Sequence, residues 1–319
     1  MKLTRHYLQW ITISLCLLLS YSCNHKDLLY EGVAGLHFSF DWSQCPGATP
    51  QLMRLAVFQD GNHQLDIPFD PEGGSTTLNS GSYGFIAYNS ESEVLSTSGS
   101  TFDDYEIFSR SADLALMSPM FASRRAPHAR GTENQPVIYS PDELWTSAHQ
   151  AMISANTTSV TMQMQPATTE YSFIINNVAN LATVTEVMAT VSGMSSSWSP
   201  VKAKCSDTHC IIPFEMKSDG QSTLTARVRC FGHCPDDVHF DHMLVIYVML
   251  TDQSKWYYTF DITEALHDSN HHSEDGSGGT PEIPIVLDEL PLPTPVPAEG
   301  MGLQPKVDDW QEITIEKTL

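Results

Sequence analysis

Most of the chain carries apolar side chains at every second position, with polar side chains between them. Between Leu36 and Trp42, for example, His37, Ser39 and Asp41 separate the apolar residues. Successive side chains of a β-strand point to opposite faces of a sheet, so this pattern predicts strands that bury one face and expose the other. The segments with this pattern are 36–42, 53–57, 83–87, 160–164, 171–175, 224–228 and 256–262.

Residues 244–250 are apolar throughout, which predicts a central strand that is buried on both faces. Turn-forming residues such as Asp60-Gly61-Asn62 and Gly73-Gly74 separate the alternating segments. Helical patterning is sparse, and only residues 141–145 and 178–181 suit a single helical turn each. Many short strands at this spacing predict an all-β chain of antiparallel β-sandwiches.

A change of strand near residue 166 gives the predicted domain organisation. One strand ends at Gln165 and the next begins near Tyr171, and 319 residues suffice for two domains of ordinary size. We therefore predict an N-terminal β-sandwich domain over residues 23–166 and a C-terminal one over residues 167–319. The second domain is expected to end in a short strand over residues 310–315.

Residues 109–135 are predicted to form a long loop, which carries Arg124, Arg125 and Arg130 in an otherwise acidic protein. An exposed loop of this kind suits cleavage by an arginine-specific protease. A solvated connector is the interpretation that we favour.

The N-terminus has the order of a secretory signal: a basic start, an apolar run over residues 10–19 and then small residues. A membrane-spanning helix needs roughly 20 apolar residues, and this run is shorter. The segment Leu19-Ser20-Tyr21-Ser22-Cys23 resembles a bacterial lipobox. We therefore predict a signal peptide over residues 1–22 and a lipid anchor on Cys23. The alternative is an ordinary secretory signal followed by a chance cysteine.

Acidic residues outnumber basic ones, with 38 Asp and Glu against 16 Lys and Arg and a net charge of −22. Loss of Lys2 and Arg5 with the signal would make the mature chain more negative still. Binding of phosphates depends on Lys and Arg, so we expect no nucleic-acid partner and no membrane contact apart from the anchor. The hydrophobic fraction of 41% is enough for packed cores.

Cysteine pairing is expected in an exported chain because the compartment is oxidising. Cys205 and Cys210 flank a four-residue loop, so they could face each other across a hairpin at a distance close to that of a disulfide. We predict disulfides among Cys205, Cys210, Cys230 and Cys234 and leave their connectivity open. The alternatives are free thiols and a zinc site of these cysteines with His209, His233, His239 or His242.

A second group of histidines, His267, His271 and His272, lies in a polar, Gly- and Ser-rich segment with nearby acidic residues. It could form a weak metal site, but ordering a flexible loop costs chain entropy. We favour a solvated loop and predict no bound metal and no cofactor.

Tryptophans could line a carbohydrate-binding surface. Trp42 and Trp256 lie in rows of core-facing residues, so a core role is favoured for them. For Trp145, Trp198 and Trp310, the sequence does not decide between a core role and a binding surface. The sequence has no hydrolase, kinase, nucleotide-binding or metalloprotease motif, and we therefore predict a non-enzymatic protein without catalytic residues.

Short motifs spread in order over nearly the whole mature chain resemble an uncharacterised lipoprotein family of the fimbrillin superfamily. The motifs are Cys23-Asn24-His25-Lys26-Asp27-Leu28, Phe40-Asp41-Trp42, Met53, Gly81-Ser82-Tyr83, Tyr88-Asn89, Pro141-Asp142-Glu143-Leu144-Trp145, Ser192-Gly193-Met194, Asp261-Ile262-Thr263 and Val307-Asp308-Asp309-Trp310. That superfamily supplies anchors, minor subunits and stalks of type V pili. The resemblance implies two tandem transthyretin-like β-sandwiches and an outer-membrane lipoprotein in which only Cys23 carries over as a functional residue.

Together these expectations predict a pilus-related or adhesive protein that is anchored by lipid to one face of the outer membrane. Its partners would be fimbrillin-like subunits that pair with an open sheet edge. The candidate edges are the terminal strand around Ile313 and Ile315 and the first strand of the mature chain. The rival hypothesis is a surface glycan-binding lipoprotein with exposed aromatic rings, and an exported hydrolase is a third.

Overall fold

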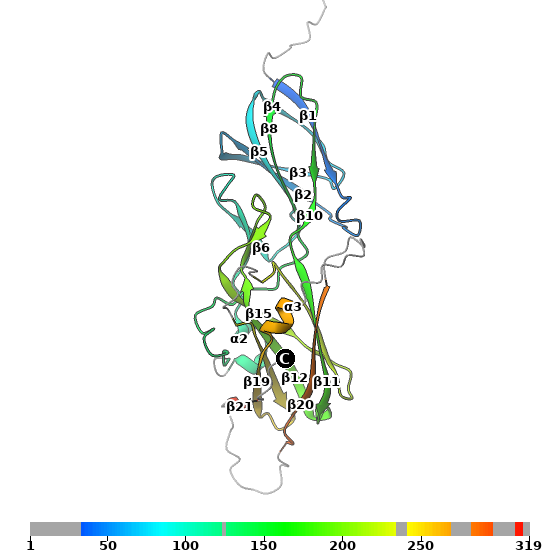
Figure 1. Cartoon of the computed structure of the whole chain (residues 1–319), viewed down its shortest axis with the longest axis vertical. Coiled ribbons are helices and arrows are strands. Elements are labelled where there is room, and N and C mark those ends of the chain that lie inside the picture. Colours follow the sequence, from blue (N-terminus) through cyan, green and yellow to red (C-terminus); the bar gives the residue numbers. More distant parts are fainter. Residues whose placement is uncertain (1–32, 123–125, 234–240, 269–281, 296–309, 315–319) are drawn as a thin grey trace, which may run out of the picture.

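The computed structural model describes residues 33–122, 126–233, 241–268, 282–295 and 310–314, and this part of the chain is built almost entirely of strands (Figure 1). Its strands form five sheets. The few helical elements are short: α2 (Leu114–Met117), η1 (Pro119–Phe121), η2 (Leu181–Thr183) and α3 (Thr263–Asp268). The predicted all-β class is confirmed. No helix in these ranges is long and apolar enough to cross a membrane.

A first β-sandwich occupies one end of the elongated molecule (Figure 1). One of its sheets has the order β4 (Gly74–Asn79), β1 (Val33–Asp41), β9 (Ser159–Gln163). The facing sheet has the order β10 (Gln165–Pro166), β8 (Trp145–Ile153), β5 (Gly81–Asn89), β2 (Met53–Gln59), β3 (Asn62–Phe69). Alternate residues of both sheets, such as Phe38, Leu55 and Phe85, fill the core between them.

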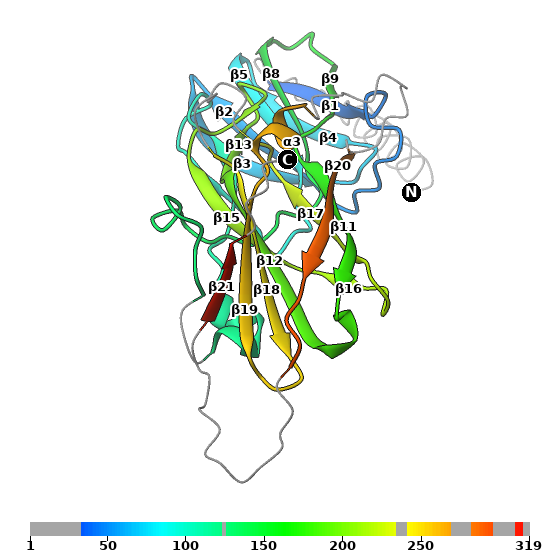
Figure 2. The same ribbon diagram turned by 60° about the horizontal axis from the view of Figure 1, so that its bottom comes forward.

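A second β-sandwich forms the other end of the molecule (Figure 2). One sheet has the order β16 (Lys217–Ser218), β17 (Leu224–Cys230), β11 (Thr169–Ala179), β20 (Glu282–Pro291). The other has the order β15 (His209–Glu215), β12 (Val184–Ser195), β18 (Met243–Leu250), β19 (Lys255–Asp261), β21 (Trp310–Thr314). The prediction of a central strand over 244–250 is confirmed, because β18 lies between β12 and β19 with both faces covered.

A fifth sheet joins segments from the two halves of the sequence. Its order is β14 (Lys204–Cys205), β13 (Ser197–Ser199), β7 (Glu106–Ser109), β6 (Leu95–Ser98). It packs against the outer face of the first sandwich, where Phe58 and Ile86 meet Ile107 and Trp198. The pairing of β7 with β13 crosses residue 166, and the division of the chain at that residue stays a prediction.

Two sequence expectations differ from the observed elements. The pairs β1–β9, β11–β20 and β19–β21 are parallel, so the sandwiches are not purely antiparallel. Residues 141–145 do not form a helical turn. The backbone N–H of Leu144 donates to Thr168 Oγ1 and that of Trp145 to Asn89 Oδ1, at 3.2 and 2.9 Å, and these buried contacts hold the segment extended.

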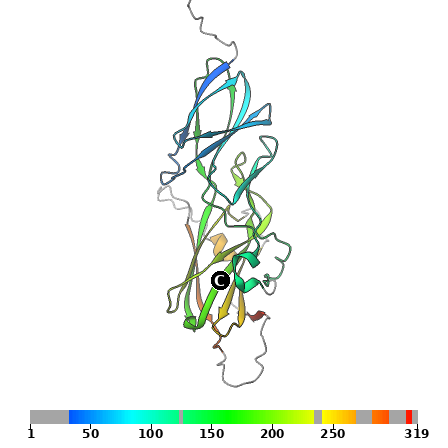
Figure 3. The same cartoon turned by 180° about the vertical axis from the view of Figure 1, so that it is seen from behind.

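The segment that follows β7 covers the outer face of the second sandwich (Figure 3). α2 and η1 lie there, and Met120 and Phe121 pack against Met188, Val245 and Tyr247 of the sheet beneath. The sequence predicted a long loop over residues 109–135. The structure shows that this connector instead packs onto the sheet and forms a separate hydrophobic core with it.

Candidate functional site

One open side of the first sandwich lies between the edge strands β3 and β4, which are consecutive in the chain but belong to opposite sheets. β4 pairs only with β1, and from Gln64 onward β3 pairs only with β2 in the described part of the chain. Each therefore presents unpaired backbone groups to the outside, which is the usual requirement for pairing with another chain. This pair of edges is the candidate functional site.

Leu65 shows that the core itself opens at this place. It lies opposite Val57 in the β2–β3 ladder, on the face that packs into the first core, yet 43% of its surface is exposed. A cavity of about 360 Å³ separates it from Leu78 of β4. Val57 and Tyr83 form the floor of this cavity. A side chain from an added strand would thus meet apolar core residues.

The turn between the two strands is tightly packed. Gly73 has φ of +111°, and a Cβ there would lie 2.0 Å from the carbonyl oxygen of Phe38. A Cβ on Gly74 would lie 2.4 Å from the ring of Phe69. Backbone and ring are thus packed tightly where β3 passes into β4. The cavity lies toward the other end of the strands, where Gln64 and Asn79 line it.

The two edges suggested by the sequence have different surroundings. β1, the first described strand, is paired on both sides, with β4 and with β9, so the expectation of an open edge there is wrong. β21 is the last strand of its sheet and pairs with β19, so Ile313 does lie at an edge (Figure 2). Ile315 and Cys23 lie outside the described residues, and the lipid anchor stays a prediction.

The predicted cysteine hairpin does not form. Cys205 lies opposite Trp198 on β13, whereas Cys210 lies opposite Met194 on β12, because the two short segments pair with different strands. Cys210 and Cys230 are free thiols. Cys234 lies outside the described residues, so disulfides within this set of four stay a prediction. Burial raises the pKa of the Cys210 thiol well above its usual range, so this thiol is not an activated nucleophile.

Three histidines that the sequence assigned to different groups meet at one end of the second sandwich. His233 follows β17, His242 precedes β18 and His267 lies on α3. Their ring centroids are 5.1 to 5.5 Å apart in all three pairs. Burial lowers the pKa of both His233 and His242 to about 4, with a further contribution from the neighbouring rings. Both imidazoles are therefore neutral at pH 7. His239, His271 and His272 lie outside the described residues.

The tryptophans of the described residues do not form an exposed platform. Trp42 is half-buried and packs edge to face against the buried Trp145, with centroids 6.0 Å apart. Trp198, Trp256 and Trp310 are half-buried. The exposed large hydrophobic side chains of the described residues are all aliphatic: Leu52, Leu65, Leu116, Met152 and Val286.

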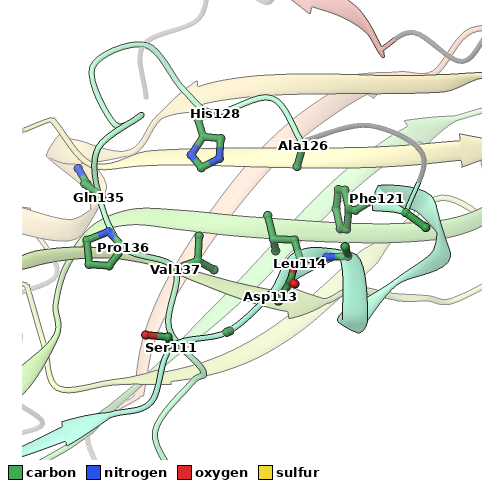
Figure 4. A pocket seen from close by; sticks show the side chains of 12 residues that line it. Ser111, Asp113, Leu114, Phe121, Ala126, His128, Gln135, Pro136 and Val137 are labelled. Carbon is green, nitrogen blue, oxygen red and sulfur yellow. Dashed lines mark hydrogen bonds between the residues drawn. The ribbon is translucent and has the colours of Figure 1, made fainter.

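A second cavity of about 680 Å³ lies beneath the connector after β7 (Figure 4). Leu114, Phe121 and Val137 project around it together with His128. Two of its polar side chains stabilise the connector itself: Asp113 accepts from the Ala115 N–H, and Gln135 Oε1 accepts from the Gly193 N–H, both at 2.9 Å. Of the arginines in this connector, Arg130 is exposed, and Arg124 and Arg125 lie outside the described residues.

Comparison with known proteins gives the family. Residues 22–215 match the family model described as a domain of unknown function, DUF5119. The chain belongs to the DUF5119 family. No curated protein matches the sequence significantly. The match covers the first sandwich, the joining sheet and the beginning of the second sandwich.

Solved structures from Bacteroides share the fold of this DUF5119 protein. A candidate adhesin from Bacteroides ovatus is 20% identical, with 86% of this chain and 99% of that chain covered and a TM-score of 0.59. Another candidate adhesin from Bacteroides ovatus is 11% identical over 83% and 90% of the chains, with a TM-score of 0.52.

A third neighbour is a candidate polysaccharide-binding protein (DUF1812) from Bacteroides thetaiotaomicron. It is 10% identical over 80% and 90% of the chains, with a TM-score of 0.52. At these identities the likeness shows the fold. The β-sandwich fold that the resemblance implied is confirmed.

Proposed function

We propose that this DUF5119 protein is a non-enzymatic cell-surface protein of adhesion or pilus assembly, held at the outer membrane by a lipid on Cys23. It acts by contact, through the edge between β3 and β4. The observation that carries this proposal is the cavity between those two unpaired edges, in which Leu65 is exposed although it belongs to the core face.

Strand addition fits the geometry of this site. A partner strand that lies beside β3 or β4 would gain main-chain hydrogen bonds along its length, while every second side chain would enter the cavity. The backbone bonds would supply affinity, and the shape of the cavity would select the side chains. The partner is thus expected to be an extended, alternating segment of another subunit, such as a fimbrillin-like protein.

The adhesin names of two structural neighbours agree with this proposal. The neighbour named as polysaccharide-binding supports the rival, a surface glycan-binding lipoprotein. Sugar recognition by ring stacking needs aromatic faces that reach the solvent, and the exposed hydrophobic residues in the described ranges are aliphatic. This observation favours strand pairing.

Capture of partners from membranes of the native host tests the proposal. We expect the wild-type protein to retain pilus-type or adhesin-type subunits. Leu65→Lys places a charge in the cavity and should abolish their capture. Leu116→Lys is the matched control, because Leu116 is an 82% exposed leucine on α2 in the connector. Equal capture by both variants, or glycan-array binding that replaces capture altogether, would overturn the proposal.

A further inference from the structure

The cluster formed by His233, His242 and His267 ties together three segments that are distant in the sequence. β17 ends three residues before the first of these residues, β18 begins directly after the second, and α3 carries the third. Figure 1 places α3 at the end of the second sandwich that faces the first. Three imidazole rings in mutual contact are poor packing units for an apolar core, because each has two nitrogens that require partners.

Unmet hydrogen bonding is concentrated at this cluster. Nε2 of His233 and Nε2 of His267 are both buried without a hydrogen-bond partner among the described residues. Buried polar atoms are nearly always paired, so each exception requires an explanation such as a bound ion. Here two such nitrogens belong to rings whose centroids are only 5.1 Å apart.

The other nitrogen of His233 is engaged as expected for a metal ligand. Its Nδ1 lies 3.1 Å from the hydroxyl of Tyr171, which is almost fully buried. A ligating histidine usually uses its second nitrogen in a hydrogen bond of this kind, which fixes the ring and leaves the first nitrogen for the metal. Because the Tyr171 hydroxyl engages Nδ1 of His233, Nε2 is the nitrogen of this ring that is left for a metal ion.

The spacing of the rings agrees with three ligands on one small ion. Imidazole nitrogens bind Zn²⁺ at 2.0–2.1 Å in tetrahedral sites, so the centroids of two ligating rings lie roughly 5 Å apart. The three observed separations are 5.1, 5.4 and 5.5 Å. Imidazole donors suit zinc and its transition-metal neighbours and not calcium or magnesium, which prefer oxygen.

We propose that His233, His242 and His267 bind one divalent transition-metal ion of the zinc class, which fastens α3 and the ends of β17 and β18 to one another. Within the described ranges, no three His, Cys, Asp or Glu side chains are already arranged as a preformed metal site. Binding therefore requires the rings to turn. Rotation about χ2 is soft for histidine, and rings already 5 Å apart need no backbone movement to converge.

The test uses the full chain, stripped with a chelator and dialysed against ZnCl₂ or CoCl₂. We expect one Zn²⁺ per chain, a rise in Tm on zinc addition and a visible Co²⁺ spectrum of nitrogen-ligated, tetrahedral type. The His267→Ala variant should show none of these three signals. If that variant does not fold, His267→Gln replaces it in the test. His149→Ala, which removes an exposed histidine of the first sandwich, is the control and should bind as the wild type.

Tyr171→Phe separates a positioning role from a structural one. It removes the hydrogen bond to His233 but keeps the ring, so we expect zinc affinity to fall about 10- to 100-fold while the Tm of the metal-free protein changes little. Retention of zinc by His267→Ala would overturn the proposal, as would loss of zinc in Cys205→Ser with a thiolate-type Co²⁺ spectrum. Failure of the wild-type chain to bind either ion would also overturn it.

Discussion

Lys255 donates a hydrogen bond from its buried ammonium group to the backbone carbonyl oxygen of Met120, at 2.7 Å. The ammonium group also lies 5.7 Å from the centre of the Trp310 ring, which stacks on Phe121. Lys255 is on β19 and Met120 is in η1, so this bond links the connector after β7 to the outer face of the second sandwich. It joins elements that are 135 residues apart in sequence.

Replacement of this lysine should loosen the connector. Lys255→Met keeps the length of the side chain but removes a charged donor, and a hydrogen bond to a charged group contributes about 1.5–3 kcal/mol. We expect the free energy of unfolding in urea to fall by that order and proteolysis after Arg130 to accelerate. Lys202→Met, at an exposed position, should change neither. Equal stability of the two variants would contradict this role for Lys255.

The turn between β3 and β4 depends on Gly73. Gly73→Ala would place a Cβ 2.0 Å from the Phe38 carbonyl oxygen at a φ of +111°. We expect a loss of about 3 kcal/mol or more, because both strain and a clash must be relieved. Gly61→Ala is the matched control: its φ is +81° but nothing lies within 4 Å of the added Cβ, so a loss of about 1–2 kcal/mol is expected. Thermal melts of the two variants measure the difference.

Cys45 should make the first sandwich sensitive to alkali. Its thiol is buried and donates to the Met164 carbonyl oxygen at 3.5 Å. Burial, with a contribution from the charge of Glu143, raises its pKa from 9.0 to about 11. Between these two values the unfolded chain loses this proton and the folded chain keeps it. Stability contributed by this group is therefore present below pH 9 and is lost as the pH rises toward 11.

The measurement is urea unfolding of the wild type and of Cys45→Ala at pH 8 and at pH 10.5. Each pKa unit corresponds to about 1.4 kcal/mol, so the wild type should lose more stability between these pH values than the variant by an amount of that order. Parallel losses in the two proteins would show that Cys45 titrates normally.

The anchor is tested by Cys23→Ala. Without the thiol no diacylglyceryl group can be attached, and a chain with a net charge of −22 has little attraction for anionic headgroups. We expect the variant to move from the membrane fraction to the soluble fraction on cell fractionation. Cys45→Ala, which alters a buried cysteine, should remain with the membranes. Membrane association of the Cys23 variant would argue against the lipid.

Local pattern predicted the strands well because alternation is a local property. The segments around residues 36–42, 171–175 and 244–250 are strands β1, β11 and β18, as their side-chain pattern indicates. The pairing partners of these strands could not be predicted in the same way. β1 pairs in parallel with β9 more than a hundred residues later, and no local pattern specifies such a pairing. The open edge of β3 is visible only once these partners are known.

Clusters formed by distant residues escaped sequence reasoning for the same reason. His233 and His242 were grouped with nearby cysteines, and His267 with the histidines that follow it, since adjacency was the available guide. The fold instead brings these three together through β17, β18 and α3. Likewise, Pro141 suggested a helix start, but buried hydrogen bonds to Leu144 and Trp145 override that local preference.

Cross-linking in the native cell envelope tests the central claim most directly. A photo-reactive amino acid replaces Gln64 at the open edge of β3 or, as the control, His37 on β1, which is also exposed but is paired on both sides, with β4 and with β9. If β3 takes a partner strand, illumination should link position 64, but not position 37, to another envelope subunit. No product at position 64, or equal products at both positions, would contradict the account.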